Sequence, residues 1–277
     1  MRHATKMKRI LYFSLLFCLF YPGLSNSQVF SPKFKHLSTI EGLSQSHVST
    51  ILKDSRGFMW FGTEDGLDKY DGYKFTHYKN DRNNKSSIID NLVYDILEYP
   101  AGNLWVTTAG GLDRLDLDKN IFTHYSNGWM DGVSAIFLDN RKRIWLGTGK
   151  GLYQLNIKNG SFTKYSRFDN KTGAALNDFI YKIAEDTKGN LWVATTAGLL
   201  RFDPKTGKFV QYIHDPKNNH SIGADLVKTV FVDHQGDIWV GTRGGGVALY
   251  DKKVTHLQIS TMIQTTQTAF AITIYFR

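Results

Sequence analysis

Tryptophan recurs along this chain at a nearly constant spacing. Five of the six tryptophans stand 40 to 47 residues apart, at Trp60, Trp105, Trp145, Trp192 and Trp239. Each is followed three residues later by threonine, and a glycine comes shortly afterwards, at Gly66, Gly111, Gly151, Gly198 and Gly246. A self-similar period of this size marks a chain built from one repeated supersecondary unit. The repeat therefore limits the chain to solenoid, propeller or array architectures.

Each copy has the pattern of four short strands. An apolar run such as Val48 to Leu52 precedes a turn like Asp54 to Gly57, and the tryptophan strand, a glycine turn and two further strands follow. Aromatic residues favour pleated strands, and glycine supplies the positive φ of tight turns. No 3.6-residue periodicity supports helical repeats. The sequence predicts an all-β propeller with five four-stranded blades, at about residues 48–78, 93–125, 133–165, 180–212 and 227–257.

The tryptophan strings, of the form W-[FVL]-[GTA]-T with a following glycine-leucine turn, resemble the two-component regulator propeller repeats. The resemblance covers about residues 30–257. It implies the extracytoplasmic sensor region of a hybrid two-component histidine kinase and response regulator protein, with an oligosaccharide as the ligand class. In that family a membrane span, a kinase, a receiver and a DNA-binding segment follow the propellers. None of these later segments stands in the 277 residues, so we expect binding here rather than catalysis.

The amino-terminal 27 residues have the composition of a secretory signal. Arg2, Lys6, Lys8 and Arg9 precede an apolar run from Ile10 to Phe20, and small residues follow up to Ser27. That order is typical of a cleaved signal peptide. Its removal near Ser27 would lower the net charge from +9 to +5 and place the protein in the periplasm or outside the cell. No other segment is apolar enough to span a membrane.

The two ends of the repeat region suggest an incomplete ring. Residues 34–37 match the pattern of a fourth strand without the three strands that should precede it, so we expect an orphan strand. The family resemblance implies a parent ring of about seven blades. The segment 258–277 lacks charge until its last residue and lacks the repeat, which indicates a truncated or frame-shifted end. The alternative is a divergent last strand.

Ligands of propellers usually meet the edge formed by the turns after the tryptophan strands and by the loops that link blades. Charged residues in these turns differ from blade to blade, and the candidates are Glu64, Asp65, Lys150 and Arg243. Trp129, the tryptophan outside the repeat, stands in a linking loop and could stack on a sugar ring. The alternative is that Trp129 packs beneath its own loop.

Other chemistry has weaker support. The glycine-rich stretches at residues 147–151 and 242–246 lack the spacing of a phosphate-binding loop. His36, His77, His124 and His256 recur at one repeat position, which indicates outer-strand residues rather than a metal cluster. A polar residue begins each inner strand, and strand capping is favoured over a metal ring at Ser46, Asn91, Asp131, Asp178 and Asp225. No cofactor, metal or nucleic acid is expected.

The sequence therefore favours a propeller that belongs to a sensor and binds an oligosaccharide. A homodimer formed by the parent sensor protein is compatible with this interpretation. A secreted propeller enzyme of the polysaccharide lyase type is the main alternative. A truncated remnant without activity is the third.

Overall fold

The structure is a computed structural model that describes residues 34–125, 132–168, 175–176, 178–218, 220–251 and 256–258. The predicted signal segment, Trp129, Asp131 and the tail after residue 258 lie outside the described residues. The chain divides into two units, Met1–His36 and Leu37–Arg277, and all strands belong to the second.

The described strands form five four-stranded antiparallel sheets, which we number as blades 1 to 5 in chain order. Blade 1 contains β1 (Val48–Lys53), β2 (Met59–Thr63), β3 (Gly66–Tyr70) and β4 (Phe75–Tyr78). Blade 2 contains β5 (Val93–Glu98), β6 (Asn103–Thr108), β7 (Gly111–Asp116) and β8 (Ile121–His124). Blade 3 contains β9 (Val133–Leu138), β10 (Ile144–Thr148), β11 (Gly151–Asn156) and β12 (Ser161–Tyr165).

Blade 4 contains β15 (Ile180–Glu185), β16 (Leu191–Thr195), β17 (Gly198–Asp203) and β18 (Lys208–Tyr212). Blade 5 contains β19 (Val227–Val232), β20 (Ile238–Thr242), β21 (Gly246–Asp251) and β22 (His256–Gln258). A short pair, β13 (Arg167–Phe168) and β14 (Ala175–Leu176), lies in the connection between blades 3 and 4.

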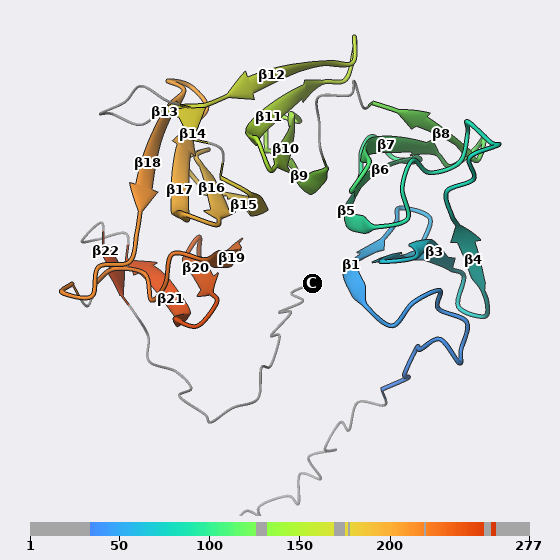
Figure 1. Cartoon of the computed structure of the whole chain (residues 1–277), viewed down its shortest axis with the longest axis horizontal. Helices are drawn as coiled ribbons and strands as arrows, with labels where there is room; N and C mark the ends of the chain where they lie inside the picture. Colours follow the sequence, from blue (N-terminus) through green and yellow to red (C-terminus); the bar gives the residue numbers. More distant parts are fainter. Residues whose placement is uncertain are drawn as a thin grey trace, which may run out of the picture. The chain divides into compact units, whose positions relative to one another are not determined.

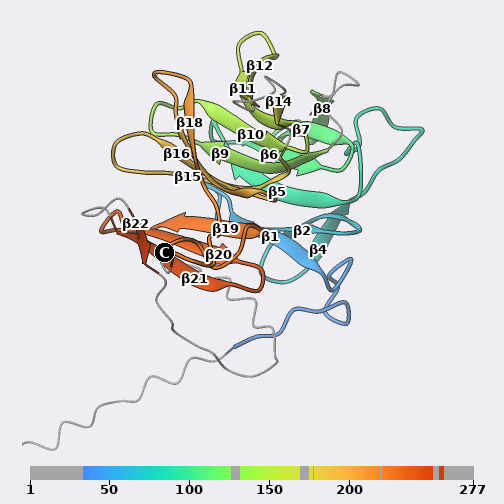
Figure 2. The ribbon, with the colours of Figure 1, turned by 60° about the vertical axis from the view of Figure 1, so that its left-hand side comes forward.

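Neighbouring blades meet through their first strands. β1 contacts β5, β5 contacts β9, β9 contacts β15, and β15 contacts β19. Figure 1 shows these five strands turned toward a common centre, and in Figure 2 the strands of blades 1 and 5 lie below those of the other blades. The predicted all-β propeller of five four-stranded blades is confirmed.

The turns confirm the glycine pattern. The glycine that begins each third strand has a positive φ, between 75° and 136°. A second set of left-handed positions precedes each tryptophan strand, and four of its members are Gly57, Gly102, Gly189 and Gly236. The fifth is Lys142, whose φ of 62° is unusual for a residue with a side chain.

The first four repeat tryptophans pack against the following blade. Trp60 joins a core cluster with Val93 and Val106 of blade 2, and Trp192 joins one with Val227 and Val240 of blade 5. The first four repeat tryptophans are almost fully buried, whereas Trp239 of blade 5 is partly exposed. Burial of a large aromatic side chain is among the strongest single contributions to a core. These tryptophans therefore place much of the apolar core at the boundaries between blades.

An aspartate, buried in blades 1, 3 and 4 and partly buried in blade 5, binds the tryptophan in four of the five blades. The indole Nε1 donates to the Oδ2 atoms of Asp54, Asp139, Asp186 and Asp233 over 2.8–3.0 Å. The other carboxylate oxygen of Asp186 accepts the backbone N–H groups of Lys188 and Asn190, which closes the turn. In blade 2 the carbonyl oxygen of Tyr99, which precedes a cis proline, accepts from Trp105 instead.

One predicted element is absent from the structure. Residues 34–37, expected as an orphan fourth strand, are described and belong to no strand. A strand requires a ladder partner for its backbone groups. The outer position of blade 5, which such a strand would fill, is already occupied by β22.

Candidate functional site

All four charged candidates from the sequence lie on one edge of the blades. We call this edge, which contains the turns 64–65, 109–110, 149–150, 196–197 and 243–245 and the linking loops 79–92 and 213–226, the loop edge. Backbone hydrogen bonds hold these parts together, because Gly66 N donates to Asn91 O and Gly198 N donates to Asp225 O. Glu64 and Arg243 are exposed, and Asp65 and Lys150 are partly buried.

Each candidate contacts residues near its own turn. Glu64 pairs with Nδ1 of His47 at 2.9 Å, and Asp65 pairs with Lys79. The backbone N–H of Lys150 donates to Oγ1 of Thr148. Arg243 donates its N–H to Leu226 O. The structure thus brings Glu64 and Asp65 into one turn of blade 1, with Lys150 on blade 3 and Arg243 on blade 5. Trp129 lies outside the described residues.

The polar residues before the inner strands hold the linking loops in place. Asn91 Oδ1 accepts the N–H of Asn80, and Asp225 Oδ1 accepts the N–H of His214. The corresponding Asp178 pairs with the Arg167 guanidinium at 2.6 Å. The predicted capping is therefore confirmed at Asn91 and Asp225, although the backbone N–H groups that they cap belong to the loop that arrives from the preceding blade.

A polar cluster lies where the inner strands converge. Asp95 of β5, which is 6% exposed, pairs with Nζ of Lys182 of β15 at 3.0 Å. Its other oxygen accepts from Thr50 Oγ1 of β1 at 3.1 Å. Three blades therefore meet at one carboxylate.

Two of the recurrent histidines bind buried aspartates. Nδ1 of His77 lies 2.7 Å from Oδ1 of Asp68, and Nδ1 of His124 lies 2.6 Å from Oδ1 of Asp113. Asp68 also accepts from the N–H and hydroxyl of Ser44, and Asp113 accepts the N–H of Ile89. Each pair thus joins an outer strand to the preceding loop. In the described part of the chain, no three His, Cys, Asp or Glu side chains gather in a way that could hold a metal ion.

Burial raises the pKa values of several side chains. Burial raises the pKa of the Asp113 carboxyl above its ordinary value, although the hydrogen bond from His124 works in the opposite direction. Burial likewise raises the pKa of Glu185, whose Oε2 accepts the N–H of Asn140 of blade 3. The pKa of the Tyr212 phenol is also raised, first by burial and then by its hydrogen bond with Tyr250. Each of the three groups forms a hydrogen bond to a different strand or loop, so these pKa shifts accompany contacts that hold the fold together.

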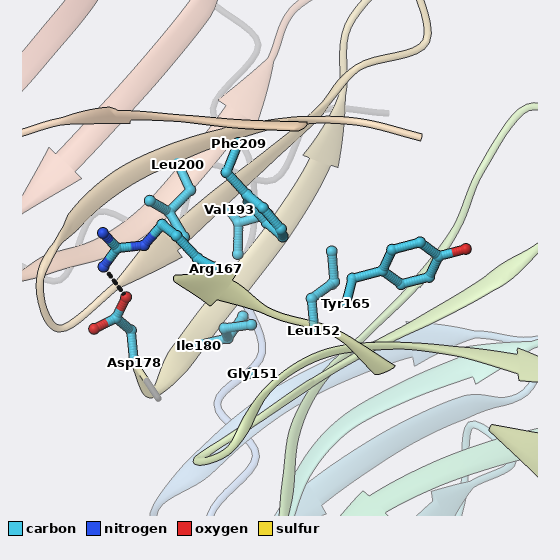
Figure 3. A pocket seen from close by; sticks show the side chains of 9 residues that line it. All are labelled: Gly151, Leu152, Tyr165, Arg167, Asp178, Ile180, Val193, Leu200 and Phe209. Carbon is cyan, nitrogen blue, oxygen red and sulfur yellow. Dashed lines mark hydrogen bonds and ion pairs between the residues drawn. The ribbon is translucent and has the colours of Figure 1, made fainter. Parts of the chain in front are cut away.

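A pocket opens at the loop edge between blades 3 and 4 (Figure 3). Apolar side chains from both blades line it, together with the ion pair between Arg167 and Asp178. Figure 3 shows Arg167 and Asp178 facing one another beside Leu200 and Ile180. The pocket thus combines an apolar floor with charged groups at its side, which is the usual composition of a small-molecule site.

The sequence analysis did not predict a role for Arg167. It also did not predict a role for the linking-loop residues Ile88 and Ile222, both of which are fully buried. A signal was available, because the three long linking loops have the same length, from Tyr78 to Val93, from Tyr165 to Ile180 and from Tyr212 to Val227. Aligning these loops would have placed Arg167 opposite Asn80 and His214.

Comparisons with known proteins agree with this geometry. The family described as two component regulator propeller matches residues 42–65, 175–197 and 221–244. A curated relative, "Histidine kinase P4" of Formosa agariphila, is 39% identical over 82 residues, which are 30% of this chain and 6% of the relative. Within the described residues, no helix is long and apolar enough to cross a membrane.

Two solved structures share the fold. The extracellular domain of a protein assigned to a hybrid two-component system in B. thetaiotaomicron superposes with a TM-score of 0.64 and 23% identity, over 79% of this chain and 28% of that one. Virginiamycin B lyase from Staphylococcus aureus superposes with a TM-score of 0.53 and 15% identity, over 73% of this chain and 69% of that one. The chain spans less than a third of the sensor domain. Three of the five blades thus contain matches to the two component regulator propeller repeat, and the chain shares the propeller fold of these solved structures.

Proposed function

We propose that the five blades are part of the ligand-sensing region of a two-component sensor. In this proposal the signal segment is cleaved near Ser27 and the blades act outside the cytoplasm. The proposed ligand is an oligosaccharide. The observation that carries this proposal is the contrast between a repeated scaffold and a varied loop edge. A repeat tryptophan and a turn glycine recur in every blade, whereas the loop edge carries Glu64 and Asp65 in one blade, Lys150 in another and Arg243 in a third.

Such an edge suits a polyhydroxylated ligand. Carboxylates accept hydrogen bonds from hydroxyl groups, and Lys and Arg donate to hydroxyl and ring oxygens. The likeness to a sensor domain supports recognition without turnover, since the proposed role of the propeller is to bind and to transmit.

The test is calorimetric titration of the secreted full chain with a panel of oligosaccharides, followed by chromatography of each ligand. We expect saturable binding without product, weakened by Lys150→Ala or Arg243→Ala. Lys205→Ala, which alters the turn between β17 and β18 at the opposite edge, is the matched control and should leave affinity unchanged. Product formation, or binding that none of the loop-edge variants weakens, would overturn the proposal.

Trp129→Ala tests the stacking role separately. Loss of affinity for every bound sugar, with an unchanged melting temperature, would support stacking. Unchanged affinity would remove Trp129 from the site.

A further inference from the structure

Each boundary between two blades has two halves. The earlier blade supplies a tryptophan and an aliphatic residue of its third strand, and we call this side its tryptophan face. The later blade supplies aliphatic residues of its first strand, and we call this side its first-strand face. Between blades 1 and 2 the halves are Trp60 with Leu67 and Val93 with Ile96. The boundary between blades 4 and 5 repeats the arrangement with Trp192, Leu199, Val227 and Val230.

A glycine on the second strand lets the two halves approach closely in two of these boundaries. A Cβ built on Gly62 of blade 1 would lie 2.6 Å from Cγ1 of Val93 of blade 2. A Cβ built on Gly147 of blade 3 would likewise overlap with Ile180 of blade 4. Glycine in a strand often marks a place where another segment comes close to the backbone. The glycine of the tryptophan face is therefore the seat of the β-branched residue that begins the next first strand.

Blade 5 has every element of a tryptophan face, namely Trp239, Gly241 and Val247. Val247 pairs with Gly241 in the same register in which Leu67 pairs with Gly62. Val247 is 40% exposed, whereas the residues at its position in the other blades, Leu67, Leu112, Leu152 and Leu199, are at most 2% exposed. Trp239 is partly exposed, and a Cβ built on Gly241 would meet, among the described residues, only Thr229 of its own blade. The tryptophan face of blade 5 is therefore open.

Blade 1 has the opposite half without a partner. Val48 and Ile51 occupy the ladder positions that Val93 and Ile96 occupy in blade 2. Both are partly exposed, whereas Val93 and Ile96 are 0% and 6% exposed. Blades 2 to 5 receive a tryptophan from the preceding blade on this face, and blade 1 has no preceding blade among the described strands.

We propose that the tryptophan face of blade 5 binds the first-strand face of blade 1 in a second copy of this chain. Val48 of the second copy lies opposite Gly241, as Val93 lies opposite Gly62. Trp239 and Val247 pack against Ile51 of the second copy, as Trp60 and Leu67 pack against Ile96. The contact therefore extends the series of boundaries that the chain already contains.

The choice of a second copy follows from where the two halves lie. Blades 1 and 5 are the ends of the series, and each contacts one neighbouring blade through its first strand (Figure 1). Neither face covers the other within one chain, because Val247 and Ile51 both remain exposed to solvent. Exposed apolar surface of this kind marks an interaction site. Since each copy carries one half of each kind, the contact is head-to-tail rather than symmetric.

The test is a complementation experiment with the secreted full chain, followed by sedimentation velocity. Val247→Glu blocks the tryptophan face, and Ile51→Glu blocks the first-strand face, because each places a carboxylate in an apolar contact. The wild type should associate as its concentration rises. Each variant alone should associate at least about tenfold more weakly. An equimolar mixture should form a one-to-one pair, because the Ile51→Glu chain keeps its tryptophan face and the Val247→Glu chain keeps its first-strand face.

Val210→Glu is the matched control. Val210 is 41% exposed, as Val247 is 40% exposed, but it lies on the outer strand of blade 4 and belongs to neither face. This variant should associate like the wild type. Melting curves followed by circular dichroism establish that each variant is folded. Val48→Lys blocks the first-strand face through another side chain and replaces Ile51→Glu if that variant does not fold.

Three outcomes would overturn the proposal. The first is a wild-type chain that stays monomeric at every concentration. The second is association of the Ile51→Glu chain alone with wild-type affinity, which would mean that two tryptophan faces pair with each other. The third is equal weakening by Val210→Glu, which would show that the association is non-specific. None of these measurements requires a sugar, so they are independent of the sensing function.

Discussion

The hydroxyl of Ser134 donates to the carbonyl oxygen of Ile180 over 2.6 Å, across the boundary between blades 3 and 4. The same hydroxyl contacts the carbonyl of Gly147 in its own blade. Ser49 makes the same two bonds, to Val93 and Gly62, between blades 1 and 2. The close approach requires a glycine on the second strand, because a Cβ built on Gly147 would lie 2.8 Å from the Cβ of Ile180.

Gly147→Ala should therefore destabilise the propeller by about 3 kcal/mol, since the added methyl group overpacks a buried boundary. Urea unfolding followed by circular dichroism measures the change. Gly149→Ala is the matched control, because its Cβ would meet Phe179 at an ordinary 3.7 Å. Equal effects of the two substitutions would show that the boundary can relax around a methyl group.

Lys142→Gly should stabilise the protein by about 1 kcal/mol. Lys142 occupies a left-handed position at which four other blades have glycine, and a side chain there costs about that much. The mirror substitution Gly189→Ala should lower stability by a similar amount, because Gly189 has a φ of 82°. Melting temperatures of both variants check the pair, and a destabilised Lys142→Gly would contradict the expectation.

Asp186→Ala should cost about 3 kcal/mol, because it removes a buried acceptor of the Trp192 indole and of two backbone N–H groups. Asp203→Ala, at a solvent-exposed turn in the same blade, is the control and should cost much less. Thermal unfolding of both variants makes the comparison. Similar losses would mean that the tryptophan bond contributes little.

Asp113 should give stability a distinctive pH dependence. Its folded pKa is raised by burial, so the folded state holds the proton more tightly than the unfolded state. That contribution is complete below the unfolded pKa and is lost as pH rises through the folded pKa. Acidification from about pH 7 to about pH 4 should therefore favour the wild type relative to Asp113→Asn in urea unfolding.

Asp71→Asn serves as the control of opposite sign. Backbone hydrogen bonds from Lys74 and Tyr73 lower the Asp71 pKa, so its contribution is present above the unfolded pKa and is lost as pH falls. The same direction for both aspartates would contradict the burial argument for Asp113.

The blade pattern could be predicted from the sequence because its determinants are local. Trp192 and Gly198 fix one strand and one turn within a few residues of each other, and both recur in every copy. The hydrogen bond from Asp186 to the indole is also local, and its signal is an aspartate six residues before the tryptophan in four copies. The same aspartate also closes the turn, so its position alone does not indicate a bond to the indole.

Contacts between blades could not be predicted from local sequence patterns. Gly147 of blade 3 lies against Ile180 of blade 4, and nothing in the local sequence around either residue indicates that contact. The prediction of a strand at residues 34–37 was wrong for a related reason. Its pattern was right locally, but a strand also needs a partner, and pairing is a property of the assembled sheet.

The ion pair between Asp95 and Lys182 joins residues 87 positions apart, whereas most ladder bonds of this fold close hairpins of a few residues. Closing a long loop costs more chain entropy, so contacts within a blade can form early and this pair only after blades 2, 3 and 4 have docked. The two charges therefore meet only in the assembled propeller. Their bond distinguishes a completed arrangement from a string of correctly folded but unassembled hairpins.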